Sequence, residues 1–86
     1  MRVLIPTPLR SYTGNEKVVE ADGRTVDELL HDLDRHYPGL RFRVVDEQNR
    51  LRTHMKVFVG QESIRDLATA VDGHEEITLM QALSGG

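Results

Sequence analysis

One amphipathic helix set among short strand-like stretches narrows the fold of this 86-residue chain more than any other feature. Thr25 and Glu28 match a capping box, and Pro38-Gly39 ends the segment, so the predicted helix spans residues 26–36. The apolar residues spaced along one face of this helix are Val26, Leu29, Leu30, Leu33 and Tyr37. Such a face must be covered by a second layer of structure.

Four stretches around this helix have the pattern of β-strands. Residues 2–7 and 16–21 have apolar centres and are close enough in sequence to form an antiparallel hairpin. Residues 54–59 and 77–80 alternate apolar and less apolar side chains. One helix can cover one face of a sheet, so we predict an α+β domain with a mixed sheet packed on one main helix. If the first and last strands are neighbours, the fold is a ubiquitin-like β-grasp.

The connections between these elements are less regular. Residues 40–52 are strongly charged, and we expect Val44-Val45 and Leu51 to form a short, exposed hairpin. After a turn at Gly60, we expect an irregular connection anchored by Ile64 and Leu67, with one short helical turn near residues 66–70. No repeat, low-complexity stretch or linker interrupts the chain, which indicates a single domain.

The side chains shrink after the last predicted strand, ending in Ser84, Gly85 and Gly86. We expect a domain over residues 1–83 and a flexible tail over residues 84–86. A backbone without Cβ atoms can enter a slot too narrow for side chains and deliver its terminal carboxylate to chemistry inside. A frayed terminus without a function explains the same residues, because chain ends are usually loose.

The composition excludes several classes of site. The chain has no cysteine, so it has no disulfide, thiolate metal site or thiol nucleophile. Its net charge is −3 and its arginines are spread from Arg2 to Arg65, which argues against a nucleic-acid partner. No apolar run is long enough to span a membrane, and no signal-peptide pattern opens the sequence, so we expect a cytoplasmic protein. We expect no metal site and interpret the histidines as solvated: His31, His36, His54 and His74.

Several stretches match the motifs of a known family: KVFVG at residues 56–60, DG at 72–73, EITL at 76–79 and ALSGG at 82–86. The chain resembles, over essentially its whole length, the ThiS/MoaD family of ubiquitin-like sulfur carrier proteins. IPTPLR at residues 5–10 and Asp32-Leu33 look closest to the carriers that serve a phosphoserine-dependent cysteine synthase. Gly60 stands where the family usually has Asn, and His74 where it has Asp, which bears on partner identity more than on carrier chemistry.

The resemblance implies a protein-bound sulfur donor rather than an enzyme. A ThiF/MoeB-like partner would use ATP to adenylate the carboxylate of Gly86, and a sulfur donor would convert the adenylate to a thiocarboxylate. A sulfur-accepting synthase would then make cysteine or another sulfur-containing metabolite. Gly85 and Ser84 would lie in the partner's channel, while the chain itself would bind no cofactor. A processing metalloprotease is a further candidate partner, since some relatives carry residues beyond the two glycines.

We expect partners to grip an apolar patch formed by Leu4, Phe58 and Met80. These residues alternate with the expected core positions, which are Val3, Ile5, Val57, Val59, Ile77 and Leu79. The alternative is that residues 40–52 bury the patch.

Two other functions share the same tail. A ubiquitin-like modifier would form isopeptide bonds through Gly86, and a non-reactive β-grasp subunit would insert its tail into a partner without activation. The sequence leaves open the final sulfur acceptor, protein modification, processing at Gly86 and the oligomeric state.

Overall fold

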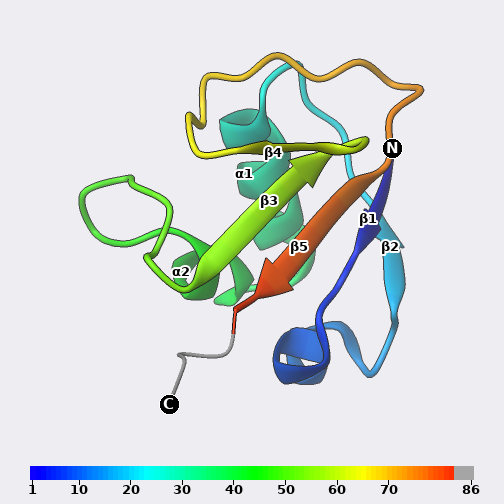
Figure 1. The fold of residues 1–86 in the computed structure, drawn as a ribbon. Helices are drawn as coiled ribbons and strands as arrows, with labels where there is room; N and C mark the ends of the chain where they lie inside the picture. The colour runs from blue at the N-terminus through cyan, green and yellow to red at the C-terminus, as the bar shows by residue number, and fades with distance from the viewer. Residues whose placement is uncertain (83–86) are drawn as a thin grey trace.

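In the computed structural model, which describes residues 1–82, five strands form one mixed sheet (Figure 1). The strands are β1 (Arg2–Leu4), β2 (Val18–Glu20), β3 (Met55–Val59), β4 (Glu62–Ile64) and β5 (Ile77–Gln81). Their order across the sheet is β2-β1-β5-β3-β4. β1 and β5 pair in parallel, and the other neighbours pair antiparallel. The first and last strands are central neighbours, which confirms the predicted β-grasp.

Helix α1 (Val26–His36) covers one face of this sheet, at the position predicted for it (Figure 1). The Thr25 hydroxyl accepts a hydrogen bond from the Glu28 amide at 3.2 Å, and the Glu28 carboxylate accepts one from the Arg24 amide at 3.1 Å. These bonds satisfy amide groups that have no partner within the helix. The side chains that α1 buries are Val26, Leu29, Leu30, Asp32 and Leu33.

The core lies between α1 and the sheet, because alternate residues of each strand point toward the helix. Five residues predicted for this core are buried: Val3, Ile5, Val57, Ile77 and Leu79. Val59 was also predicted to be in the core, but it is only half-buried at its margin. It comes at the end of β3, immediately before the Gly60 turn, where fewer neighbours cover it.

The first strand is shorter than predicted and leads into a 3-10 helix. The predicted strand over residues 2–7 ends at Leu4, and η1 (Thr7–Thr13) follows. Pro6 has no amide hydrogen to donate to the sheet, so the ladder stops there. Gly14 then ends η1 with a φ of 62°.

The segment after α1 is helical and packs one face into the core, contrary to the prediction of an exposed hairpin. Leu40–Val44 forms α2, and the side chains of Leu40 and Val44 point into the core. A bridge between Val45 and Leu51 does form, but both residues are buried as well. Five residues make little more than one helical turn, so α2 is too short to leave a periodic pattern in the sequence.

The connection between β3 and β5 contains the unpredicted strand β4. Ile64 and Leu67 are buried, as expected, but residues 66–70 form a turn and a bridge rather than a helical turn. The turn lies against the start of α1: Leu67 and Thr69 accept hydrogen bonds from the amides of residues 27 and 26 at 2.9 and 3.0 Å.

Residues 83–86 lie outside the described residues. The predicted domain boundary at residue 83 and the flexible tail over residues 84–86 therefore stay predictions. Within residues 1–82, no helix is long and apolar enough to cross a membrane.

Candidate functional site

The inner strand β5 brings the chain to the end of the sheet that lies beside α2 (Figure 1). Gln81 pairs with Met55, and the Ala82 amide donates a hydrogen bond to the His54 carbonyl at 2.7 Å. This bond continues the β3–β5 pairing one residue beyond β5. The predicted site residues Ser84, Gly85 and Gly86 follow outside the described part. Gly86 is four residues beyond Ala82 in the sequence, so it can lie at most about 14 Å from Ala82.

The face of the sheet away from α1 carries a row of side chains in register. Leu4 and Phe58 are both partners of Thr78, one from each side, and Val18 pairs with Leu4. Neighbouring residues in register point to the same face of a sheet. We call Val18, Leu4, Thr78 and Phe58 the outer row.

Met80 lies on the same face, two residues beyond the outer row toward the chain's exit. It pairs with Lys56 on β3, and 45% of its surface is exposed. Leu4 and Phe58 are half-buried. The structure thus brings all three predicted patch residues to one face, although their role in binding a partner stays a prediction.

The alternative was that residues 40–52 cover this patch as an exposed hairpin. The apolar residues of that segment instead pack into the core. Val44, Val45 and Leu51 belong to the core cluster that also contains the apolar face of α1. At the other end of the outer face, Arg2 lies 3.7 Å from Glu76. The outer face therefore has an ion pair near the start of β5, whereas toward the end of β5 it combines the apolar Met80 with Lys56.

Sequence reasoning missed one exposed apolar side chain near the exit. Phe42 on α2 is 51% exposed and lines a hollow that also includes Gln81. The signal was present, since Leu40 and Val44 occupy one face of a short helix and Phe42 falls outside that face. It could be used only after α2 itself had been identified.

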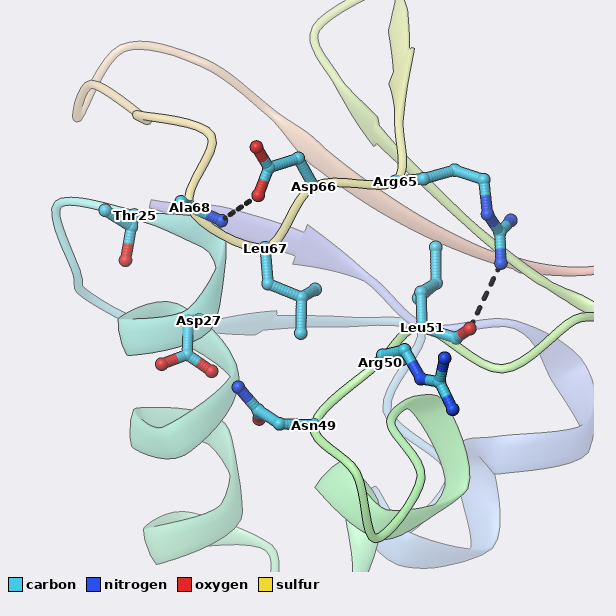
Figure 2. A pocket seen from close by; sticks show the side chains of 9 residues that line it. All are labelled: Thr25, Asp27, Asn49, Arg50, Leu51, Arg65, Asp66, Leu67 and Ala68. Atoms are coloured by element: carbon cyan, nitrogen blue, oxygen red, sulfur yellow. Dashed lines mark hydrogen bonds between the residues drawn. The ribbon is translucent and has the colours of Figure 1, made fainter.

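A separate hollow of about 570 Å³ lies at the N-terminal end of α1 (Figure 2). Two of its charged side chains, Asp66 and Arg65, form structural contacts. Asp66 accepts the Ala68 amide at 2.9 Å, and Arg65 donates to the carbonyls of Leu51, Arg52 and Met55 at 3.1 Å. Figure 2 shows Arg65 reaching across to the Leu51 carbonyl. The bonds from Arg65 hold the end of β4 against the start of β3. Asp27 also lines the hollow, and its Oδ1 is buried without a hydrogen-bond partner among the described residues.

The histidines are exposed, as we interpreted them from the sequence. His31 lies 3.6 Å from Asp27, and the ring of His36 is 2.9 Å from the Asp32 carbonyl. Within residues 1–82, no group of three or more histidine or carboxylate side chains is arranged to hold a metal ion.

Asp32 on α1 is a buried carboxylate. It accepts hydrogen bonds from the Asp22 amide at 2.9 Å and from Arg35 at 2.6 Å. These two bonds lower the pKa of the Asp32 carboxyl, the Asp22 amide having the larger effect. The contacts fasten α1 to the loop that precedes it, so Asp32 has a structural role.

Comparison with known proteins gives one family. The model of the ThiS family matches residues 3–86. Sulfur carrier protein CysO of Mycobacterium tuberculosis is 35% identical over 89 residues, covering 98% of this chain and 96% of the relative.

Solved structures agree with this comparison. A chain in the BexX/CysO complex of Amycolatopsis orientalis superposes with a TM-score of 0.92 and 38% identity, covering 99% of this chain and 98% of that one. Small archaeal modifier protein 1 of Haloferax volcanii gives a TM-score of 0.78 and 26% identity, covering 96% and 97%. The sequence match, the strand order and the full-length superpositions all place this chain in the ThiS family.

Proposed function

We propose that this chain is a sulfur carrier protein that transfers sulfur as a thiocarboxylate on Gly86. The observation that carries the proposal is the ThiS-family match over residues 3–86, which includes the two terminal glycines. The name of the CysO relatives supports the same function. The geometry of the exit agrees, because β5 directs the chain out of the sheet at an end of the strands that a partner can approach.

The proposed chemistry begins with a carboxylate that is a poor electrophile. A carboxylate oxygen of Gly86 attacks the α-phosphorus of ATP on a partner enzyme, and pyrophosphate leaves. A sulfur nucleophile then attacks the carbonyl carbon of the acyl-adenylate, and AMP leaves with the former carboxylate oxygen. If this sulfur is still bonded to a sulfur atom of its donor, a reductant breaks that S–S bond. The product on Gly86 is a thiocarboxylate. The chain provides the reacting group, and the catalytic residues belong to its partners.

The partners follow from this sequence of reactions. An adenylating enzyme of the ThiF/MoeB type holds the ATP, and a sulfur-accepting synthase takes the sulfur into cysteine or another metabolite. A processing metalloprotease acts where residues follow Gly86. We place these reactions in the cytoplasm, where ATP is available.

The short reach of the tail supports a partner contact near the end of β5. Gly86 lies within about 14 Å of Ala82, so an enzyme that holds Gly86 must approach the end of β5 closely. We propose that it contacts Leu4, Phe58 and Met80, with Gly85 and Ser84 inside its channel.

The direct test is to mix the purified chain with the adenylating enzyme of the same cell and to measure its activation by ATP–pyrophosphate exchange. Deletion of Gly85 and Gly86 should abolish exchange, and Gly85→Ala should lower kcat/KM by about 10-fold or more, because a Cβ displaces the reacting carbon. Gly73→Ala is the matched control, since a Cβ at Gly73 meets no atom within 4 Å. Undiminished exchange with the truncated chain would contradict the proposal.

A modifier function is the second candidate, favoured by the likeness to small archaeal modifier protein 1. A modifier would give conjugates of higher mass that contain Gly86 joined to lysine. Absence of both activation and conjugates would favour a non-reactive interaction subunit.

A further inference from the structure

Helix α2 leaves a phenylalanine on the surface next to the chain's exit. Leu40 and Val44 are fully buried, whereas Phe42 is 51% exposed. The guanidinium carbon of Arg52 lies 4.6 Å from the centre of the Phe42 ring, and Arg52 Nε donates to the Phe42 carbonyl at 2.8 Å. The ring is therefore held in a defined position, with much of it still open to a partner.

The side chains around this ring are mainly basic. Arg43, Arg52 and His54 line the same hollow, and neither arginine forms an ion pair with a described residue. Asp46 is the acidic residue of the hollow. Its carboxylate accepts hydrogen bonds from the amides of Gln48 and Arg50 at 2.9 and 3.0 Å, so it is already engaged in its own turn.

This surface is continuous with the exit of the chain. Gln81 lines the hollow, which has a volume of about 600 Å³. The His54 carbonyl accepts the Ala82 amide, which is the last described backbone bond before the tail. Met80 precedes Gln81 and points to the other face of β5. The chain thus leaves the sheet between two exposed apolar side chains, Met80 on the outer face and Phe42 on α2.

We propose that Phe42, Arg43, Arg52 and His54, here called the α2 surface, bind an acidic surface of the adenylating enzyme at the mouth of its channel. This inference rests on the proposed function. A basic rim around an exposed aromatic ring complements carboxylates placed around an apolar side chain, and such pairing of charge guides association. The short tail places the mouth of the channel against this surface.

The overall charge of the chain strengthens this assignment. The net charge is −3, so the α2 surface is a local basic region on an acidic protein. A partner that used net charge alone would meet the chain in any orientation. An acidic patch on the enzyme instead selects the side from which the tail emerges.

The test measures the KM of the adenylating enzyme for this chain at about 50 mM and about 500 mM salt. We expect salt to raise the KM of the wild type. The double variant Phe42→Ala, Arg52→Gln should raise KM about 10-fold at low salt, leave the maximal rate unchanged and reduce the salt dependence. Thermal unfolding of the variant checks that α2 remains folded, and Arg43→Gln, which removes an exposed charge without a described contact, gives the same direction of change.

Arg24→Gln is the matched control, because it removes one exposed positive charge in the loop before α1. It should leave KM and its salt dependence unchanged. An unchanged KM in the folded α2 variants would overturn this inference while leaving the proposed function intact. A lowered KM would also overturn it, because the α2 surface would then weaken the binding of the chain to the enzyme. Failure of the wild type to be activated would instead overturn the proposed function and this inference with it.

Discussion

Asp32 links a single side chain to the stability of α1. Its carboxylate binds the Asp22 amide and Arg35, and both contacts favour the charged form. The folded-state pKa lies below the ordinary value of 3.8, so this carboxylate stabilises the fold above that value. The contribution is lost as pH falls through the folded-state pKa.

We therefore predict a pH-dependent effect of Asp32→Asn on the free energy of unfolding. The wild type should exceed the variant by a constant amount between about pH 7 and pH 5, and the difference should shrink below 3.8. Denaturant unfolding at several pH values measures it. Glu47→Gln is the control, because Glu47 is exposed and makes no hydrogen bond or ion pair with a described residue. A difference that does not change with pH would show that Asp32 stabilises the helix in another way.

The sequence predicted the longer strands and helices better than the short ones. The α1 helix and the positions of β3 and β5 were recognisable because their apolar periodicity is set by local geometry. Short elements such as α2 and β4 are stabilised by contacts from distant parts of the chain. Arg65, for example, holds β4 by binding carbonyls more than nine residues away. Such contacts leave no local pattern.

The candidate site shows the same division. Period two was enough to place Leu4, Phe58 and Met80 on one face. It could not give the register that brings Leu4 and Phe58 to opposite sides of Thr78, because register depends on which strands pair. Phe42 was missed because its exposure depends on α2.

The outer row gives a prediction that concerns the face of the sheet. Phe58→Asp should leave the domain folded, because Phe58 points away from the α1 core, and should raise the KM of the adenylating enzyme about 10-fold by placing a charge in an apolar contact. Steady-state activation kinetics and thermal unfolding measure the two effects. Phe58→Leu keeps an apolar side chain and should retain most of the activity. Normal kinetics for a folded Phe58→Asp variant would exclude the outer row as a contact surface.

At the scale of the whole molecule, the domain over residues 1–82 supports the proposed reactive end of the chain. Its core, its capped helix and its central parallel β1–β5 pair fix the direction in which the chain leaves the sheet. Two exposed apolar side chains, Met80 and Phe42, flank that exit from different faces. A partner that recognises both can position Gly86 without any catalytic group from this chain.

The chain contains no cysteine, so a reagent that alkylates thiols at neutral pH has no thiol of this chain to modify. The decisive measurement is mass spectrometry of the chain purified from its own cells, before and after such alkylation, with fragment ions that locate the modified residue. We predict that a fraction of the chain carries sulfur in place of one carboxylate oxygen on Gly86 and gains one alkyl group there. Location at Gly86 separates this change from methionine oxidation, which adds an oxygen at Met1, Met55 or Met80. A chain that acquires no alkylatable sulfur at Gly86, even when the adenylating enzyme, ATP and a sulfur donor are supplied, would contradict the account.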